Sequence, residues 1–328
     1  MRVLITGGAG FIGSEFTRAA VRGRYPALRG AEVVVLDKLT YAGNLANLEG
    51  VISHPGLRFV HGDICDARLV AELMTGTDLV VHFAAESHVD RSIAGAGVFV
   101  TTNVLGTQVL LQAAVDAGVG RFVHVSTDEV YGSIETGAWA EEQPLAPNSP
   151  YAAAKAGSDL MVRAYHRTHG LHTCITRCPN NYGPYQFPEK VIPLFVTNLI
   201  DGKKVPLYGE GLNVRDWLHV SDHCRGIALV AERGRSGETY HLGGGPSLTN
   251  HELTQRLLDL TGTGWPMVQR VADRLGHDQR YSLDSSKAAA ALGFAPTVPF
   301  AAGLAGTVDW YRDNRSWWEP LRAGAVVA

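Results

Sequence analysis

Short apolar runs and amphipathic stretches alternate along the first half of the chain. The apolar runs are Val3–Thr6, Val33–Asp37, Leu57–His61, Leu79–Ala84, Arg121–Ser126 and Thr173–Arg177. Their hydrophobic residues are consecutive rather than alternating, which favours strands covered on both faces. The segments with helical spacing between them include Ser14–Arg22, Val100–Ala117 and Tyr151–His169. Strands and helices in alternation predict an α/β fold with a doubly wound parallel sheet.

The pattern changes after Cys178. Proline and glycine become frequent in Pro179–Pro193, and the strand–helix alternation is lost. Helical spacing returns at Leu194–Asp201, Asp222–Arg233, Asn250–Thr261 and Ser285–Leu292. We therefore expect a first domain over residues 1–178 and a second, smaller α+β domain over residues 179–328. Part of residues 217–233 is expected to pack on the first domain.

The composition limits the classes of function. Of 328 residues, 45% are hydrophobic and 19% are charged, which is typical of a folded globular chain. The formal charge of -3 leaves no basic excess for a nucleic-acid partner. No apolar run approaches the roughly 18 residues of a membrane span, so we expect a cytoplasmic protein without a membrane partner. Cys174 and Cys178 have C-x₃-C spacing without a second pair, so no metal site is predicted.

A glycine-rich segment, Thr6–Gly13, follows the first predicted strand and leads into a helix. Gly8, Gly10 and Gly13 satisfy G-x-G-x-x-G, and Gly7, Gly10 and Gly13 also satisfy G-x-x-G-x-x-G. Such glycines permit a tight turn and a close backbone approach to a pyrophosphate, which the helix N-terminus also favours. The segment therefore predicts a dinucleotide site rather than an ordinary glycine turn.

Acidic residues close to the ends of the second and third predicted strands refine this site. A carboxylate at Asp37 accepts hydrogen bonds from both adenosine ribose hydroxyls and repels a 2′-phosphate, which favours NAD over NADP. Lys38 is adjacent and weakens that discrimination. Asp63 fits two interpretations equally well, a contact with the adenine amino group and a helix N-cap.

Tyr151 and Lys155 form Y-x-x-x-K in a predicted helix, and a spacing of four places both on one face. A phenol with a pKa near 10 is a poor base at neutral pH. A nearby ammonium and a cationic nicotinamide ring stabilise the phenolate, which then takes a hydroxyl proton while hydride leaves the same carbon. Alone the motif also fits an ordinary amphipathic helix, but the upstream nucleotide motif favours the catalytic interpretation.

Thr127, Asp128 and Glu129 follow the fifth predicted strand. The threonine hydroxyl can orient a substrate hydroxyl at Tyr151. Two adjacent carboxyls in one site push one pKa upward and yield a neutral acid beside a charged base. A solvated turn is the alternative, but the carboxyl edge of a parallel sheet is where ligands bind, which favours a catalytic role.

These motifs, with Ala84–Ser92 and Arg177–Pro184, resemble the extended short-chain dehydrogenase/reductases and, within them, the dTDP-glucose 4,6-dehydratases. The resemblance covers nearly the whole chain. Its most specific element is the pair Asp128 and Glu129, because related 4-epimerases and decarboxylases lack both acids together. It implies an NAD-binding Rossmann domain, a nucleotide-sugar domain and a lyase that converts dTDP-glucose into dTDP-4-keto-6-deoxyglucose.

The resemblance also implies the order of steps. Tyr151, helped by Lys155 and Thr127, takes the C4 hydroxyl proton while NAD accepts hydride from C4. The 4-ketone acidifies the C5 proton, so Glu129 removes it while Asp128 protonates the departing C6 hydroxyl. Hydride then returns to C6 and a proton to C5. The cofactor is regenerated in each cycle and is expected to stay bound.

Two pockets are implied in the same way. The cofactor residues are Gly7, Gly10, Phe11, Ile12, Gly13, Asp37, Lys38, Leu39, Thr40, Asp63, Ile64, Phe83, Ala84, Ala85, Ser87, Thr102, Tyr151, Lys155 and Asn181. The substrate residues are Ser87, Thr127, Asn180, Lys190, Val191, Pro206, Leu207, Tyr208, Arg215, Asn250, Arg274 and His277. Arg215 and Arg274 suit bidentate binding of a diphosphate, and Tyr208 is suited to lie against the base. His88 lies near the site and receives no step.

Several alternatives remain open at the level of sequence. Tyr151 and Lys155 also suit a UDP-sugar 4-epimerase or decarboxylase, which share them but lack the acid pair, and a non-catalytic NAD(H)-sensing scaffold is the third interpretation. The residues do not distinguish thymidine from uridine. By analogy with the family, a homodimer is expected through the helices at Val100–Ala117 and Tyr151–His169.

Overall fold

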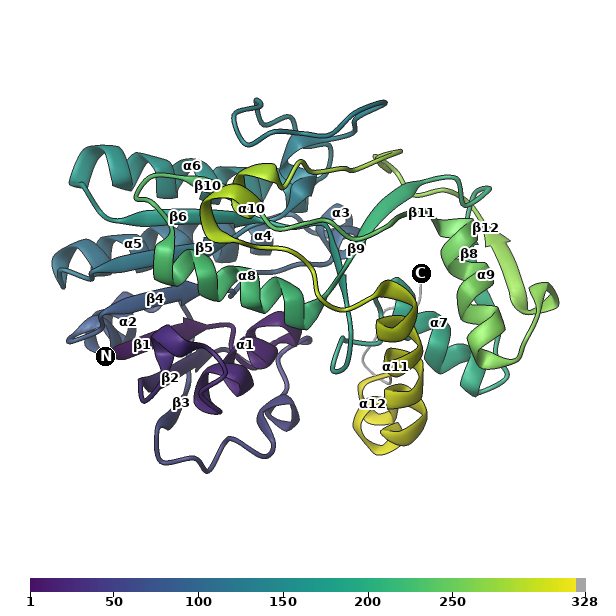
Figure 1. Cartoon of the computed structure of the whole chain (residues 1–328), viewed down its shortest axis with the longest axis horizontal. Helices are drawn as coiled ribbons and strands as arrows, with labels where there is room; N and C mark the ends of the chain where they lie inside the picture. The colour runs from purple at the N-terminus through teal and green to yellow at the C-terminus, as the bar shows by residue number, and fades with distance from the viewer. Residues whose placement is uncertain (323–328) are drawn as a thin grey trace.

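A seven-stranded, wholly parallel sheet forms the larger part of the molecule (Figure 1). The computed structural model describes residues 1–322. The strand order is β3-β2-β1-β4-β5-β6-β10. Their bounds are β1 (Arg2–Thr6), β2 (Glu32–Asp37), β3 (Leu57–His61), β4 (Leu79–His82), β5 (Arg121–Val125), β6 (Thr173–Arg177) and β10 (Thr239–His241). The predicted doubly wound α/β fold is confirmed.

Helices cover both faces of this sheet. On one face lie α1 (Phe11–Val21), α8 (Val220–Arg233) and α10 (Ser286–Leu292). On the other lie α2 (Ala67–Met74), α5 (Thr107–Asp116) and α6 (Pro150–His169). Val3 and Ile5 of β1 pack on the first layer, and Leu4 between them packs on the second. Because successive side chains point to opposite faces, a strand buried on both sides needs a continuous apolar run.

Two elements of the larger part come from beyond residue 178. β10 pairs in parallel with β6, where Tyr240 lies beside Thr176. α8 packs against α1 and β5. The sequence pattern missed β10 because it is only three residues long. The division of the chain at residue 178 stays a prediction, and the central sheet takes chain from both sides of that point.

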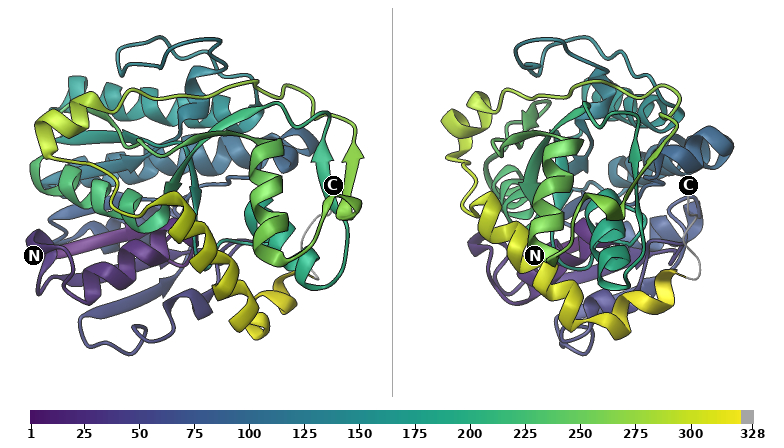
Figure 2. Two further views of the ribbon diagram at one scale, coloured as in Figure 1. Left: turned by 45° about the vertical axis from the view of Figure 1, so that its right-hand side comes forward. Right: turned by 90° about the vertical axis from the view of Figure 1, so that its right-hand side faces the viewer.

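The smaller part lies beside the carboxyl edge of the sheet (Figures 1 and 2). Its strands are β7 (Asn180–Tyr182), β8 (Val205–Tyr208), β9 (Val214–His219), β11 (Ser247–Thr249) and β12 (Val268–Val271). Its helices are α7 (Val191–Ile200), α9 (Asn250–Thr261), α11 (Phe300–Asp313) and α12 (Arg315–Arg322). They enclose a separate apolar core that includes Phe195, Leu257 and Tyr311. α7 begins three residues before the predicted range, because Pro193 fits the first turn of a helix.

Short elements connect the larger ones. They are η1 (Pro26–Leu28), η2 (Leu45–Leu48), α3 (Val89–Ala94), α4 (Gly97–Phe99), η3 (Val100–Gly106), η4 (Asp128–Tyr131) and η5 (Trp265–Met267). α4, η3 and α5 run on as one helix over Gly97–Asp116, in which η3 is π-helical. By length and composition this helix is apolar enough to cross a membrane, which the sequence analysis did not identify. In the structure it packs against α2 and α6.

Candidate active site

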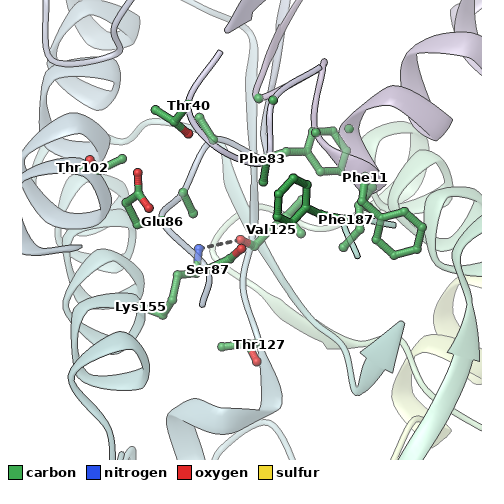
Figure 3. A pocket seen from close by; sticks show the side chains of 18 of the residues that line it. Phe11, Thr40, Phe83, Glu86, Ser87, Thr102, Val125, Thr127, Lys155 and Phe187 are labelled. Carbon is green, nitrogen blue, oxygen red and sulfur yellow. Dashed lines mark hydrogen bonds between the residues drawn. The ribbon is translucent and has the colours of Figure 1, made fainter. Parts of the chain in front are cut away.

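Two cavities meet at the carboxyl edge of the central sheet. The first follows the ends of β1, β2, β4 and β5, and Figure 3 shows its lining side chains. The second extends into the smaller part of the molecule. Glu129, Asn180, Asn181, Gln186 and Lys190 line both. Ligands that fill the two cavities would therefore both contact these five residues.

The glycine-rich turn leaves room only for backbone. A Cβ at Gly7 would lie 2.5 Å from the Ala84 nitrogen, and Gly7 has a φ of 70°. A Cβ at Gly13 would lie 2.2 Å from the Gly7 oxygen. No side chain caps α1 at Gly10, so the N–H groups of its first turn are available to an anion. This arrangement fits the diphosphate of a dinucleotide.

Asp37 and Asp63 stand on the adenosine side of this cavity. The Asp37 carboxylate accepts hydrogen bonds from the backbone nitrogens of Ala9 at 2.9 Å and Leu39 at 2.8 Å. Asp63 forms an ion pair with Lys38 at 2.6 Å. The N-cap of α2 is Asp66, which excludes the capping role considered for Asp63. The carboxylate partner of Lys38 is thus Asp63, which follows β3, and not Asp37, which ends the neighbouring strand β2.

The predicted cofactor residues lie together with one exception. All of them except Leu39 line the first cavity. Leu39 has a φ of 54°, and its side chain packs against the core on the α1 side of the sheet. It contributes its backbone N–H to Asp37 instead. Leu39 therefore positions the carboxylate and does not wall the cavity.

Tyr151 and Lys155 lie on the cavity side of α6. The helix begins at Pro150, and the Ser149 side chain caps it by accepting a hydrogen bond from the Ala152 nitrogen at 3.1 Å. Lys155 Nζ donates to the Val125 oxygen at 2.7 Å, the dashed line in Figure 3. Burial lowers the pKa of Lys155 to about 8.

The Tyr151 phenol is neutral at neutral pH in this environment. Burial, and next the charge of Glu129, raise its pKa well above the ordinary value. A catalytic base at this position therefore needs positive charge brought close to its oxygen. Lys155 is the cation of the same helix face.

Thr127, Asp128 and Glu129 form the turn that leads into η4. Thr127 Oγ1 accepts a hydrogen bond from the Glu129 nitrogen at 3.3 Å and donates to Asp128 Oδ1 at 3.2 Å. Asp128 is 2% exposed, and burial followed by the charge of Glu129 raises its pKa well above the ordinary value. Burial also raises the pKa of Glu129, but Lys190 and Arg274 oppose that rise. The neutral form is thus favoured more strongly at Asp128 than at Glu129, where nearby cations favour the carboxylate.

The predicted substrate residues divide between the cavities. Ser87 and Thr127 line the first. The second is lined by Asn180, Lys190, Val191, Pro206, Leu207, Tyr208, Arg215, Asn250, Arg274 and His277. These side chains come from β7, β8, β9, α7, α9 and the loop that follows β12. The fold thus brings together residues that no local motif connects.

The two arginines of the second cavity differ. Arg215 donates to the backbone oxygens of Val214 and Asp278, each at 2.8 Å, and lies over the Tyr281 ring at 4.2 Å. Arg274 is 3.7 Å from Asp90, and its Nε has no hydrogen-bond partner within the described chain. Arg274 is therefore freer than Arg215 to grip a diphosphate in the bidentate manner.

Comparison with known proteins agrees with this geometry. A family model described as GDP-mannose 4,6 dehydratase matches residues 4–307. The dTDP-glucose 4,6-dehydratase of Streptomyces niveus is 63% identical over 323 residues, which are 98% of this chain and 96% of that protein. The chain belongs to the dTDP-glucose 4,6-dehydratase family.

Solved structures place the chain in the same group. The dTDP-glucose 4,6-dehydratase DesIV of Streptomyces venezuelae, solved with NAD bound, has a TM-score of 0.97 and 68% identity, and the match covers 98% of this chain and 100% of that one. A UDP-glucose 4-epimerase of Thermotoga maritima has a TM-score of 0.88 and 30% identity, with 96% and 100% covered. The dehydratase DesIV therefore has both the higher TM-score and the higher sequence identity to this chain.

Several lining residues were not predicted from sequence. In the first cavity they are Leu36, Ala42, Gly43, Gly62, Glu86, Val125, Ser126, Cys178, Pro179, Gln186 and Phe187. Gln186 donates to the Asn181 oxygen at 3.0 Å, and the Phe187 ring meets Tyr41 edge-on at 5.7 Å. Gln186 and Phe187 follow a proline- and glycine-rich stretch without periodicity, so no sequence signal identifies them.

His88 and Glu189 line the second cavity. His88 was expected near the site without a role, and Glu189 was not predicted. His88 Nδ1 caps α3 by accepting from the Arg91 nitrogen at 3.4 Å, and its Nε2 lies 3.8 Å from Glu189. Burial, and next the charge of Lys190, lower the pKa of His88 to about 3, so the ring is neutral. Arg91 pairs with Glu189 at 2.9 Å. His88 therefore holds a helix end and the cavity wall together.

A contact far apart in sequence joins the C-terminal helix to the glycine-rich turn. Trp317 Nε1 donates to Asn47 Oδ1 at 2.9 Å, and Asn47 Nδ2 donates to the Ala9 oxygen at 2.8 Å. Tyr185 precedes Gln186 and Phe187, which line the first cavity. The guanidinium carbon of Arg18 lies 4.2 Å from the centre of the Tyr185 ring. These contacts clamp the two parts of the molecule together beside the glycine-rich turn.

Proposed function

We propose that the chain is an NAD-dependent lyase that converts dTDP-glucose into dTDP-4-keto-6-deoxyglucose. The observation that carries this proposal is the placement of Asp128 and Glu129 in the same cavity as Tyr151 and Lys155. An oxidation at C4 needs only the tyrosine and its lysine. An acid and a base in addition are what elimination of water from a ketone requires.

The dinucleotide belongs in the first cavity, which holds the glycine turn and Asp37. Among the described residues, Asn181 Oδ1 and Ser126 Oγ are buried there without partners, as expected of groups that meet a polar ligand. When bound, NAD supplies the hydride acceptor for C4, the hydride donor for C6 and a positive ring that favours phenolate at Tyr151. The catalytic residues then have only protons to move.

Tyr151 takes the proton of the C4 hydroxyl in the first step. Thr127 orients that hydroxyl, and the Lys155 ammonium stabilises the phenolate. The resulting ketone acidifies the proton on C5. Glu129 takes this proton. Burial raises its pKa, which makes it a stronger base, and Lys190, Arg274 and Arg215 favour the charged form that accepts the proton. Asp128 protonates the C6 hydroxyl, which leaves as water, because burial and the nearby Glu129 charge keep that carboxyl neutral.

The nucleoside diphosphate belongs in the second cavity. Arg274, with its unpartnered Nε, and Lys190 supply positive charge to the diphosphate. Tyr208 and His277 meet edge-on at 6.0 Å between ring centres and border the space for the base. A hexose between them and the first cavity reaches Glu129, which lines both.

The proposed assembly is a homodimer in the cytoplasm, where dTDP-sugars and NAD are available. Large apolar side chains are exposed on the outer side of the Gly97–Asp116 helix and of α6. Val100 is 55% exposed, Leu105 49% and Leu160 53%. A second copy of the same face would cover them. Sedimentation of the wild type beside Leu105→Glu with Leu160→Glu tests this, and a monomeric wild type would refute it.

Parallel incubation with dTDP-glucose and UDP-glucose, followed by mass analysis, tests the proposed reaction. We expect loss of one water from dTDP-glucose. An unchanged mass with an altered sugar would indicate the epimerase reaction that the likeness to the 4-epimerase keeps as the second candidate. Absence of turnover with either nucleotide sugar would contradict an enzymatic role.

A further inference from the structure

A chain of buried polar side chains continues from Lys155 away from the cavity. His124 Nε2 lies 3.5 Å from Lys155 Nζ and 3.3 Å from Asp159 Oδ1. Asp159 is on α6 four residues after Lys155, so the helix places Tyr151, Lys155 and Asp159 along one face. His124 and Asp159 are 0% exposed. His124 Nε2 therefore lies between the Asp159 carboxylate and the Lys155 amino group.

Arg177 closes this chain on its far side. Its Nε and Nη2 reach Asp159 Oδ2 at 3.0 and 2.9 Å. Its Nη1 donates to the Tyr131 hydroxyl, and that hydroxyl lies 2.7 Å from His241 Nε2. Arg177 thus bonds Oδ2, whereas Asp159 Oδ1 has no hydrogen-bond partner within the described chain. Oδ1 is the carboxylate oxygen that faces His124, whose Nε2 lies 3.3 Å away.

The charges of this cluster are fixed by their surroundings. Burial by itself would raise the pKa of Asp159, but Arg177 and His124 lower it to about 2, so Asp159 is a carboxylate. Burial and then Lys155 lower the pKa of His124 to about 4, so the imidazole is neutral. Burial opposes the ammonium of Lys155, and the charge of Asp159 is the largest influence that favours it.

We propose that Asp159 is a positioning residue for the oxidation at C4. Its carboxylate, which pairs with Arg177 and lies next to the neutral His124, keeps Lys155 in its ammonium form. The proposal rests on the role given above to Tyr151 and Lys155. Without the carboxylate, two buried cations would stand on either side of His124. Their repulsion would be removed by deprotonation of Lys155, because the guanidinium of Arg177 does not lose its proton.

Other titratable groups face the same site and stay unchanged in the test. They are Tyr151 on α6, Asp128 and Glu129 on η4, His82 on β4 and Cys178 after β6. Burial, followed by His124 and Lys155, keeps the pKa of His82 low, and its two nitrogens lie within hydrogen-bond distance of Thr6 and Thr107. Burial raises the pKa of Cys178 well above neutral pH. Asp159 and Arg177 are therefore the charges to vary.

Lysine side-chain NMR of the NAD-bound enzyme measures the proposal without relying on turnover. The lysines of the chain are Lys38, Lys155, Lys190, Lys203, Lys204 and Lys287, so their signals are few, and Lys155→Met assigns the one of interest. In Asp159→Asn we expect Lys155 to titrate about one pH unit lower than in the wild type. In Arg177→Met the pKa of Lys155 should move less, because loss of the opposing cation raises it while weaker stabilisation of the Asp159 charge lowers it.

The paired variant keeps the test decisive if Asp159→Asn folds poorly. Asp159→Asn with Arg177→Met removes both charges, and Lys155 should then titrate between the two single variants. Comparison of this variant with Arg177→Met alone gives the effect of the carboxylate on one background. Asp159→Glu keeps the charge and should restore most of the wild-type titration.

A matched control is Asp222→Asn on α8, another buried carboxylate, which pairs with Arg225 and accepts from Thr297. It should lower stability and leave the Lys155 titration unchanged. The pH profile of C4 oxidation supplies the second readout, and its alkaline limb should move with Lys155. An unmoved Lys155 in Asp159→Asn, or the same titration in the paired variant as in Arg177→Met, would overturn the proposal. Failure of the enzyme to dehydrate dTDP-glucose would instead refute the proposed function, since the titration does not depend on it.

Discussion

The cofactor side and the substrate side of the site are built differently. The first cavity rests on one continuous turn, Thr6–Gly13, whose backbone fits only glycine at Gly7 and Gly13. The second is lined by single side chains from strands, helices and loops between His88 and Tyr281. A dinucleotide is held by local backbone geometry, and a nucleotide sugar by tertiary assembly. Variants on each side should therefore fail in different ways.

The largest effect is expected where the two sides meet, at Tyr151. Tyr151→Phe removes the base and should slow oxidation at C4 by about a thousandfold or more, with NAD still bound. Stopped-flow absorbance of bound NADH measures the step. Tyr165→Phe on the same helix is the control and should keep the wild-type rate, because its hydroxyl bonds Gln108 and Gln112 and lies outside both cavities. Normal NADH formation in Tyr151→Phe would contradict the assignment.

The acid pair should separate oxidation from elimination. Asp128→Asn with Glu129→Gln is expected to oxidise C4 but to lose water about a hundredfold more slowly, so bound NADH accumulates. Mass analysis of the product together with NADH absorbance measures both steps. The exposed Glu142→Gln serves as the control. Unchanged dehydration in the double variant would refute the roles given to the two acids.

A methyl group at Gly13 should damage only the cofactor side. Its Cβ would lie 2.2 Å from the Gly7 oxygen, so the turn must shift. Gly13→Ala is expected to weaken NAD binding about tenfold to a hundredfold, as overpacking does. Calorimetric titration with NAD measures this. A Cβ at Gly95 meets nothing within 4 Å, so Gly95→Ala is the matched control. Wild-type affinity for NAD in Gly13→Ala would contradict a cofactor site that depends on the backbone geometry of the glycine-rich turn.

Arg274 should affect the substrate side and leave NAD binding unchanged. Arg274→Met removes the arginine with the unpartnered Nε, so KM for dTDP-glucose should rise about tenfold. Elimination of water should slow by less than that, because Lys190 and Arg215 still favour the charged form of Glu129. The control is Arg270→Met, because Arg270 pairs with Glu210 on the outer surface. Steady-state kinetics of both variants decide the matter. A loss of NAD affinity in Arg274→Met would show that the two cavities are not independent.

The smallest effect is expected at the contact that joins the two sides. Trp317→Phe removes the hydrogen bond to Asn47 and leaves the aromatic packing with Tyr185. NAD should leave about five times faster, because one hydrogen bond to the clamp is lost. The rate is measured as dissociation of NAD from the variant in the presence of an excess of a second enzyme that captures the released NAD. The buried Trp318→Phe should lower stability without this specific change, and equal release rates in Trp317→Phe and the wild type would exclude the clamp.

The sequence predicts the first six strands of the sheet within two residues, because strands buried on both faces need continuous apolar runs. The chain leaves the sheet at His82 and Val125, earlier than predicted, because the following residues form the loops that wall the cavity. β10 escaped notice because three residues carry no periodicity. Helix α9 has its predicted bounds, since a Thr249–Glu252 capping box marks its start.

The site follows the same division. Spacing alone brings together the glycine turn, Asp37, Tyr151 and Lys155, because one turn and one helix face set their positions. The substrate residues came from resemblance to the family rather than from spacing. Trp317 and Asn47 are 270 positions apart, and no local pattern predicts such a contact. Glu189 was not predicted, and His88 received no role, for the same reason, since tertiary packing alone makes them neighbours.

The proposed reaction requires that hydride pass from C4 to C6 of one hexose held across both cavities. Incubation with dTDP-glucose that carries deuterium at C4 measures this directly. We predict a product that has lost one water and carries the deuterium at C6 of the same molecule. A dehydrated product without deuterium at C6, or a sugar of unchanged mass, would contradict it.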